Sequence, residues 1–304
     1  GAAFLQACKE AGLHVILATN DKNKDESWPR GYIVEFFHMP ELGRRPDIIH
    51  AVAYLARSRQ IDLMVALDDF DVETVAHLRE HFRLPGMGDS LARNFRDKLA
   101  MRTTARDAGL RVPEFTGVFN YDNLREFMAR VSPPWLLKPR SEASSMGIKK
   151  IEHADEIWPA LEALGDQQSF FLMEQFVAGD VYHVDGLVDN GEVLFSMAHK
   201  YGKPPLSVYA GGGVFLTRSL DRESEESKAL VALNKQVLKA MGLVRGATHS
   251  EYIKSHADGQ YYFLENAARV GGANIAECVD YASGVNLWRE WARVEIANLR
   301  GEKY

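Results

Sequence analysis

Two hydrophobic patterns follow one another along the chain, and together they limit it to a fold that joins an α/β part to an α+β part. Within residues 1–93, apolar runs at 14–19 and 63–67 indicate buried strands, and they alternate with helical spacing at 47–58 and 72–81. Such alternation predicts parallel βαβ units and a Rossmann-like sheet. A domain of this kind normally opens with a strand, but this sequence opens with a helical segment. We therefore expect either that its first strand is missing or that another element takes its place.

The pattern changes at residue 94, where a helical segment leads into a small α+β unit. Predicted strands at 135–138 and 147–151 flank a hydroxyl-rich loop there. Beyond residue 169 the predicted strands become longer and alternate between apolar and polar residues, which is typical of antiparallel sheets. We therefore expect three units: a Rossmann-like domain at 1–93, a small lid at 94–168 and a larger antiparallel lobe at 169–304.

The composition excludes several classes of protein. The 304 residues are 46% hydrophobic and 26% charged, which is enough apolar material for a large core and excludes a disordered chain. A formal net charge of −6 disfavours a nucleic-acid-binding scaffold. No apolar stretch reaches the roughly 20 residues that span a membrane. With two cysteines and no signal-peptide pattern, we expect a cytoplasmic protein without nucleic-acid or membrane partners.

A lysine and a loop of small hydroxyl residues form the first candidate site. Lys138 ends a predicted strand, and the following loop contains Ser141, Ser144, Ser145 and Gly147. Backbone N–H groups and serine hydroxyls donate to phosphate oxygens, and a lysine adds positive charge, so this segment is a candidate phosphate-binding flap. Its spacing is not that of a P-loop. An ordinary polar hairpin with a solvent-exposed lysine is the alternative.

The strand end at 173–180 is the second candidate. Glu174 and Gln175 carry polar groups that suit the edge of a planar heterocycle, and Phe176 and Val177 suit its face. Taken in isolation, the segment favours the alternative, a strand that ends in a solvated glutamate.

Two glutamates on neighbouring predicted strands form the third candidate. Glu251 and Glu265 lie on alternating segments joined by a turn at 257–259, so a hairpin would bring both carboxylates to one face. Unpaired carboxylates at that distance repel each other unless a cation lies between them. Mg²⁺ suits such a pair, because it is held by one or two carboxylates together with phosphates and water. An exposed acidic face is the alternative.

The fourth candidate directly follows the second glutamate. Arg269, Gly271 and Gly272 precede a predicted helix, and backbone donors at the start of a helix bind anions. The alternative is a helix start with a surface arginine.

In this order, the four segments resemble the ATP-grasp superfamily, in its carboxylate–amine or carboxylate–thiol ligase branch, and the resemblance runs through essentially the whole chain. A fifth segment supports it: Asp97–Arg102 followed by Ala108–Pro113 is similar to the Asp-Lys-x-x-[Met/Phe] and Ala-Gly-[Leu/Ile]-x-[Val/Thr]-Pro pattern of that family. The resemblance implies an ATP-grasp fold with a Rossmann-like N-terminal domain, a small lid and an antiparallel C-terminal lobe.

The resemblance also implies roles for individual residues. Lys98 and Lys138 would contact the phosphates of ATP under a mobile loop at 141–147, and 174–177 would hold the adenine. Glu251 and Glu265 would ligate Mg²⁺, with Mn²⁺ as a substitute. Arg269 would face the reacting phosphoryl or acyl group, with catalytic His249 nearby.

The sequence departs from the family pattern at several positions. The usual Glu-x-Asn-x-Arg is here Glu265-Asn266-Ala267-Ala268-Arg269, so Asn266 serves as a metal ligand only if the strand bulges; otherwise water takes its place. The usual ribose-binding glutamate is missing, and Asp180 and His183 are the nearest candidates. Lys200 is the candidate for the lysine that contacts the γ-phosphate, although a solvated hairpin lysine explains it equally well.

These residues imply an ADP-forming ligase. A substrate carboxylate would attack the γ-phosphate to give an acyl phosphate, and an amine would then displace phosphate to form an amide or peptide-like bond. The substrates would be small molecules such as amino acids, and a homodimer fits the family. A biotin-carboxylase-like enzyme that activates bicarbonate and a catalytically silent ATP-binding protein are the alternatives. We also expect the sequence to end before a further small domain.

Overall fold

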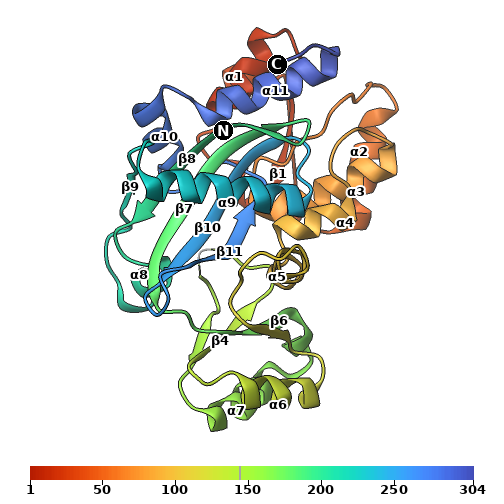
Figure 1. The fold of residues 1–304 in the computed structure, drawn as a ribbon. Helices are drawn as coiled ribbons and strands as arrows, with labels where there is room; N and C mark the ends of the chain where they lie inside the picture. Colours follow the sequence, from red (N-terminus) through yellow and green to blue (C-terminus); the bar gives the residue numbers. More distant parts are fainter. Residues whose placement is uncertain (144) are drawn as a thin grey trace.

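The computed structural model describes residues 1–143 and 145–304, and its largest feature is a five-stranded sheet in the order β11-β10-β7-β8-β9 (Figure 1). Neighbouring strands in this sheet are all antiparallel. The strands are β7 (Gly179–Asp189), β8 (Glu192–Tyr201), β9 (Thr217–Ser219), β10 (Gly246–Ser255) and β11 (Tyr261–Ala267). The long antiparallel strands expected after residue 169 are therefore present.

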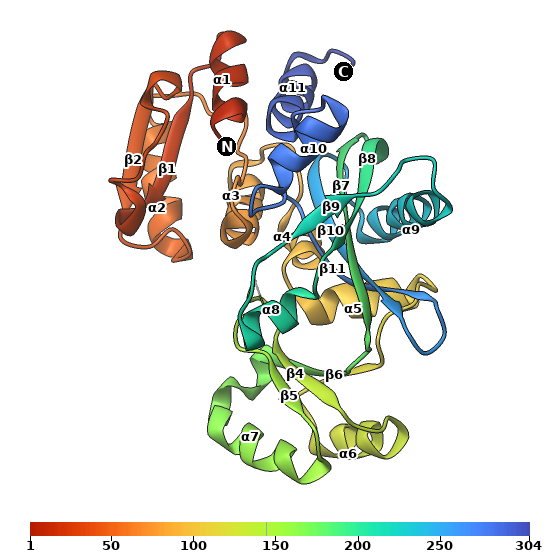
Figure 2. The same cartoon turned by 90° about the vertical axis from the view of Figure 1, so that its left-hand side faces the viewer.

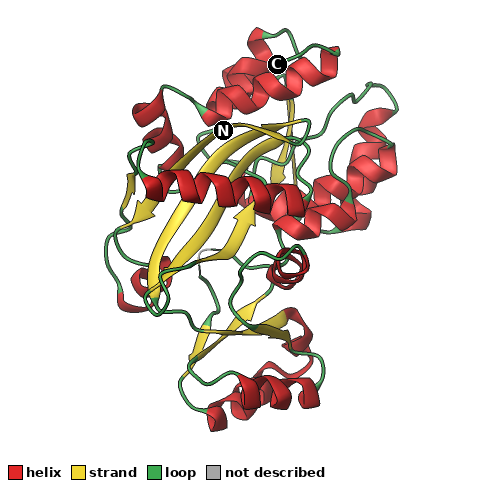
Figure 3. Cartoon of the chain, viewed as in Figure 1, coloured by secondary structure: helices red, strands yellow, loops and turns green. Residues whose placement is uncertain are grey.

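One face of this sheet is covered by helix α9 (Glu225–Met241) (Figure 3). The Ser224 side chain caps its first turn by accepting from the backbone N–H of Ser227, and Gly242 ends it in a left-handed conformation at φ 80°. Leu230, Val237 and other apolar residues of the helix pack against strand residues such as Tyr182. Because side chains alternate along a strand, the residues between these core positions point to the opposite face, which is where the candidate site lies.

A second, four-stranded sheet forms a separate lobe with its own core, in the order β3-β6-β4-β5 (Figure 1). Its strands are β3 (Phe115–Gly117), β4 (Trp135–Pro139), β5 (Lys149–Ile151) and β6 (Phe171–Gln175), and helices α6 (Tyr121–Arg130) and α7 (Ile157–Leu164) pack on it. Since β6 pairs with both β3 and β4, the expected boundary between residues 168 and 169 would divide this sheet. We therefore place β6 in the small lobe, and the other boundaries stay predictions.

Helix α5 (Lys98–Asp107) lies between the two lobes (Figure 2). Its Met101 and Ala105 belong to the core of the large lobe. Its first residue lies beside the small lobe, because the backbone N–H of Lys98 donates to the carbonyl of Arg140 at 2.8 Å. The helix is thus in contact with both lobes.

The N-terminal part contains one parallel strand pair, β1 (Ile16–Asn20) with β2 (Glu35–Met39). Its helices are α1 (Ala2–Glu10), α2 (Arg45–Ala56), α3 (Val72–Phe82) and α4 (Asp89–Ala92). The prediction of a strand at 63–67 is wrong, because among the described residues this segment forms no backbone pairing with another strand. Val65 and Leu67 nevertheless pack into an apolar cluster, and that burial produces the same hydrophobic run as a strand. The Rossmann-like assignment stays a prediction.

Helices α10 (Ile275–Ser283) and α11 (Leu287–Arg300) close the far end of the large lobe, where α11 contacts α1. The rings of Phe4 and Trp291 meet edge to face there at 5.2 Å. One further helix, α8 (Pro205–Gly211), was not expected from the sequence, and short 3₁₀ turns occupy Asp21–Asn23, Arg30–Tyr32, Asp69–Asp71, Arg93–Phe95, Ala154–Glu156 and Gly165–Phe170. Within the described residues, no helix combines the length and apolar character needed to cross a bilayer.

Candidate active site

A cleft separates the small lobe from the face of the five-stranded sheet opposite α9. Two adjoining pockets form it, and they share lining residues from both lobes: Lys98, Glu142, Ser145, Pro205, Glu251 and Glu265. The first pocket lies between β4 and β6 on one side and β10 and β11 on the other. The second pocket continues toward Arg269 and the start of α10. The two pockets are therefore parts of one continuous cleft.

Three buried charges form the base of the first pocket. Glu174 on β6 lies between Arg102 of α5, with Nη2 2.9 Å from its Oε2, and Lys138 of β4, whose Nζ contacts its Oε1. Burial alone would raise the pKa of Glu174, but the two cations lower it below its usual range. Burial lowers the pKa of Lys138, and Glu174 partly offsets that effect. With both cations charged, this group carries a net positive charge, which suits an anion.

Lys98 and Glu265 form a second ion pair beside this group. The Asp97 side chain accepts from the backbone N–H of Leu99 and so starts α5 at Lys98. Lys98 Nζ lies 3.0 Å from Glu265 Oε2 and donates to the carbonyl of Glu142 at 2.6 Å. Burial alone would raise the pKa of Glu265, but Lys98, followed by Lys138 and Arg102, lowers it to about 2. Glu265 is therefore a carboxylate at neutral pH.

Glu251 and Glu265 stand directly opposite each other on β10 and β11 and point to the cleft face. The Tyr201 hydroxyl donates to Glu251 Oε1 at 2.7 Å, and Lys98 holds Glu265 from the other side. Two carboxylates at the edge of a cleft, next to a lysine-rich anion site, fit a hard divalent ion that completes its coordination with phosphate and water oxygens. Ala267, the next residue of β11 on this face, offers no ligand.

The expected ligand Asn266 does not join these carboxylates. A bulge does occur in this hairpin, but it lies before Glu265, and the pairing of Ser250 with Asn266 is regular. The Asn266 side chain therefore shares the opposite face of the sheet with Ser250. Its Oδ1 and Nδ2 are buried and have no hydrogen-bond partner among the described residues. We consequently leave Asn266 out of the metal site.

Charged groups from three segments meet in the second pocket. Arg269 donates to the carbonyl of Val270 at 3.0 Å, and its Nη2 lies 3.6 Å from Asp69 Oδ2. The same Asp69 oxygen pairs with Arg96 at 3.0 Å. His249 also lines this pocket; burial alone would lower its pKa, but Asp185 and Glu251 raise it to about 10. The pocket thus combines these cationic groups with the carboxylates of Asp69, Glu142, Glu251 and Glu265.

Comparison with known proteins agrees with this architecture. Residues 131–277 match the family model of the ATP-grasp domain. Over 99% of its length, the chain superposes with a TM-score of 0.78 and 21% identity on the crystal structure of an L-amino acid ligase from Bacillus licheniformis, of which it covers 72%. Residues 131–277 belong to the ATP-grasp family. The expected mixed α/β, ATP-grasp fold is thereby confirmed, and the Rossmann-like character of its N-terminal part stays a prediction.

Curated relatives of this ATP-grasp chain include two ligases. The L-arginine-specific L-amino acid ligase of Bacillus subtilis is 25% identical over 77% of this chain and 58% of the relative. The alanine–anticapsin ligase of Bacillus subtilis strain 168 is 23% identical over 79% of this chain and 55% of the relative. The chain therefore corresponds to little more than half the length of these relatives.

Several residues predicted from the ATP-grasp resemblance line the cleft. In the first pocket these are Lys98, Lys138, Ser145, Glu174, Gln175, Phe176, Val177, Glu251 and Glu265, and in the second they include His249, Asn266, Arg269 and Gly272. Ser141 and Gly147 belong to the same loop but do not line either pocket, and Ser144 lies outside the described residues. Their assignment to phosphate stays a prediction.

Lys200 and Asp180 lie on the wrong face of the sheet for the roles expected of them. Lys200 Nζ pairs with Asp180 Oδ2 at 2.7 Å and lies 5.1 Å from the ring of Tyr182, which packs against α9. Adjacent Tyr201 points to the cleft, so Lys200 must point away from it. Neither residue lines the cleft, and we leave both out of the proposed site.

Two further expectations change in the folded chain. His183 is on the cleft side of the sheet, but it is fully buried and bonded to Asp185 and Thr217. Gly271 does not line either pocket; a Cβ there would lie 2.7 Å from Asp185 Oδ1. Glycine is therefore required at 271 by close packing, and the structure gives neither residue a direct contact with the cleft.

Sequence reasoning missed several residues that packing places in the cleft or, as with Arg102, directly beneath it. Arg102 follows Lys98 by one helical turn of α5, so helical spacing was a usable signal for it. Tyr201 shares the cleft face of β8 with His199, but no motif marks it. Helix α8 contributes Leu206 and Ser207 to the first pocket, and its sequence shows no nucleotide-binding pattern.

Proposed function

We propose that this chain is the ATP-binding and catalytic part of a ligase that joins a small-molecule carboxylate to an amine with release of ADP and phosphate. The observation that carries the proposal is the line of charge along one cleft, in which Lys138 and Lys98 lead to Glu265 and Glu251 and then to Arg269. Cations suit the phosphates and the carboxylate, and the glutamates suit a divalent ion between them.

In this proposal, ATP occupies the first pocket with its base between apolar side chains. Phe176, Val177, Ile253 and Leu264 line that pocket and provide apolar surface for a planar ring. Lys138 and Lys98 then face the phosphate chain. Their positive charge stabilises the negative charge that builds up on the transferred phosphoryl group.

Glu251 and Glu265 are the residues that would hold Mg²⁺ in this site. When bound, the ion would neutralise phosphate charge and orient the triphosphate. In the structure Lys98 pairs with Glu265, so Lys98 is already placed where it can exchange this carboxylate for a phosphate oxygen. Mn²⁺ has the same preference for oxygen ligands and is expected to substitute.

The substrate carboxylate would lie in the second pocket beside Arg269. Arg269 has a guanidinium that suits bidentate binding of a carboxylate, and its present partner Asp69 is 3.6 Å away. The carboxylate would attack the γ-phosphate to form an acyl phosphate, and the amine would then attack the acyl carbon and displace phosphate. The ligase names of the curated relatives support this substrate class, although the chain spans 58% and 55% of their lengths.

Cellular location and assembly stay predictions of the same proposal. Cys8 and Cys278 are both free thiols, which is compatible with a reducing compartment such as the cytoplasm. A homodimer is expected from the family resemblance alone.

The proposal is tested by measuring ADP release with Mg²⁺ and ATP across a panel of paired amino acids, with bicarbonate plus biotin as a separate arm. We expect release that requires both an acid and an amine, together with an amide product detected by mass spectrometry. Glu265→Gln should reduce it by at least about 100-fold, since a metal-binding charge is lost. Asp258→Asn, at the exposed hairpin turn, is the control and should leave it unchanged. ADP release driven by bicarbonate and biotin, or none with any pair, would contradict the proposal.

A further inference from the structure

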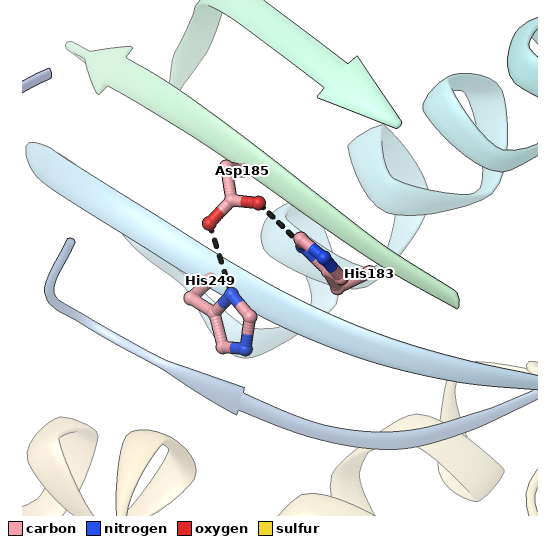
Figure 4. Close-up of side chains that lie close together, drawn as sticks. All are labelled: His183, Asp185 and His249. Atoms are coloured by element: carbon pink, nitrogen blue, oxygen red, sulfur yellow. Dashed lines mark hydrogen bonds and ion pairs between the residues drawn. The ribbon is translucent and has the colours of Figure 1, made fainter. Parts of the chain in front are cut away.

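Beneath the second pocket lies a cluster of buried polar side chains that the proposed chemistry does not use. Asp185, on the central strand β7, accepts from two histidine rings, one at each carboxylate oxygen (Figure 4). His183 Nδ1 lies 2.6 Å from Oδ2, and His249 Nδ1 lies 2.9 Å from Oδ1. His183 and Asp185 are completely buried, whereas the His249 side chain is 11% exposed and lines the cleft.

Hydrogen bonds account for this cluster better than a bound metal ion does. Each oxygen of Asp185 already has a ring nitrogen as its donor, and His183 Nε2 is bonded to Thr217 Oγ1 at 2.7 Å. His199 lies close by, but its ring is stacked on His183 at 4.7 Å and 7°. Lone pairs of two parallel rings lie in separate planes, so the two rings cannot both direct a nitrogen at one ion.

The cluster connects to the cleft through a single ring. Since Nδ1 of His249 is held by Asp185, its Nε2 faces the other way, toward Glu251 Oε1 at 3.5 Å. Gly271 packs against the same pair, because a Cβ at that position would lie 3.1 Å from His249 Nδ1. The orientation of His249 is thus determined from Asp185 on one side and from the backbone of residue 271 on the other.

We propose that Asp185 is a positioning residue that holds the His249 ring so that Nε2 faces the reacting groups beside Glu251. His249 acts at the cleft, and Asp185 acts only through it. This inference rests on the proposed ligase function, which it deepens by assigning a buried residue to the same site. It predicts that Asp185 matters for turnover and not for nucleotide binding, because Asp185 lies outside both pockets.

The decisive experiment is a double-mutant cycle with Asp185→Asn and His249→Gln. Asp185→Asn should lower kcat about 10- to 100-fold, as misplacement of a reacting group does, and leave the affinity for ATP within about twofold. In the His249→Gln background the same change should alter kcat by less than about twofold, because the ring that Asp185 holds is gone. Equal loss in both backgrounds would overturn the proposal.

Two variants separate positioning from general damage to the fold. Asp189→Asn is the matched control, since Asp189 is buried on the same strand but bonds to Asn298 at 2.8 Å, away from the cleft. It should leave kcat within about twofold. In Gly271→Ala the added methyl group would lie too close to Asp185 and His249 and would displace them. This variant should therefore reproduce the loss of kcat even if Asp185→Asn does not fold. Wild-type kcat in a folded Gly271→Ala protein would count against the proposal.

A measurement that needs no activity distinguishes failure of this inference from failure of the proposed function. In ¹⁵N spectra of the histidine rings, we expect a slowly exchanging Nδ1–H for His249 that is assigned by its loss in His249→Gln. Asp185→Asn should abolish it, and Asp189→Asn should retain it. A wild-type protein with this signal but no ligase activity would refute only the proposed function. One equivalent of tightly bound zinc that is absent from Asp185→Asn would refute the hydrogen-bonded role of Asp185.

Discussion

At the scale of single residues, the cleft is distinguished by charges that are buried in pairs and triads. Removing water from an ion costs several kcal/mol, so each such charge depends on its partner. Glu174 shows this most clearly, because its side chain is 1% exposed and both of its carboxylate oxygens face cations. Its first role is to keep Arg102 and Lys138 in place beneath the first pocket.

Glu174→Gln should therefore destabilise the protein by about 3–5 kcal/mol, because two buried cations lose their counter-charge. Urea denaturation measures this loss. Glu114→Gln is the control: Glu114 forms an ion pair with Arg130 at 2.6 Å, but both side chains are more than half exposed, so its loss should cost less than about 1 kcal/mol. Equal effects of the two changes would show that burial of the triad does not matter.

The Glu265 carboxylate predicts a pH dependence of stability. Burial alone would raise its pKa, but Lys98 lowers it to about 2, below the ordinary value, and this direction sets the sign of the dependence. A carboxyl with a lowered pKa stabilises the fold above the unfolded pKa of about 4.3 and loses that contribution as the pH falls. The difference in unfolding free energy between wild type and Glu265→Gln should thus shrink from about pH 5 to about pH 3. Lys98→Met should remove most of that slope, and an unchanged slope would contradict the assignment.

At the scale of elements, helix α5 contacts both lobes and places Lys98 in the cleft and Arg102 beneath it. Its start depends on Asp97, which caps the first turn and also pairs with Arg140 of the small lobe. A single side chain thus caps the helix and anchors it to Arg140, the residue that follows β4. The position of Lys98 relative to Glu265 depends on this start.

Asp97→Ala should cost about 0.5–2 kcal/mol for the lost cap and should also weaken ATP binding, because Lys98 and Arg102 shift with the helix. Asn120→Ala removes the equivalent cap of α6, which accepts from the backbone N–H of Asp122 at 2.8 Å in the small lobe. It should cost a similar free energy without changing ATP affinity. Thermal unfolding and equilibrium binding measure the two quantities, and an unchanged affinity in Asp97→Ala would exclude this role for α5.

At the scale of the whole molecule, the cleft is lined by side chains from two lobes that have separate cores. A ligand that contacts both lobes stabilises the folded chain by an amount that depends on its concentration relative to its Kd. Nucleotide binding should therefore raise the free energy of unfolding of the whole chain.

A non-hydrolysable ATP analogue with Mg²⁺, present at about 100 times its Kd, should stabilise the protein by about 2.7 kcal/mol and raise Tm. Chelation of the metal should reverse much of the shift, because Glu251 and Glu265 would then face phosphate without a cation between them. The double variant Glu251→Gln/Glu265→Gln should lose the response to chelation. A Tm that is indifferent to both analogue and metal would rule out a nucleotide site between the lobes.

The sequence by itself determined those features that depend on neighbouring residues or on one hairpin. The alternation of strands predicted the antiparallel lobe, and the turn between β10 and β11 predicted the hairpin that carries Glu251 and Glu265. The register set by the turn would place Leu264 opposite Glu251, so the bulge in this hairpin was needed to bring Glu265 there. The order of the motifs was likewise sufficient to identify the family.

Tertiary structure alone decided which face of each strand meets the cleft and which distant charges pair. Period-two alternation shows that Tyr201 and Lys200 point in opposite directions, but only the packing of α9 on one face shows which of them reaches the cleft. The contact of Glu174 with Arg102 joins the small lobe to helix α5, and the two residues are 72 positions apart in the sequence. No local pattern encodes such a contact, since each charge can be buried only where the fold places its partner beside it.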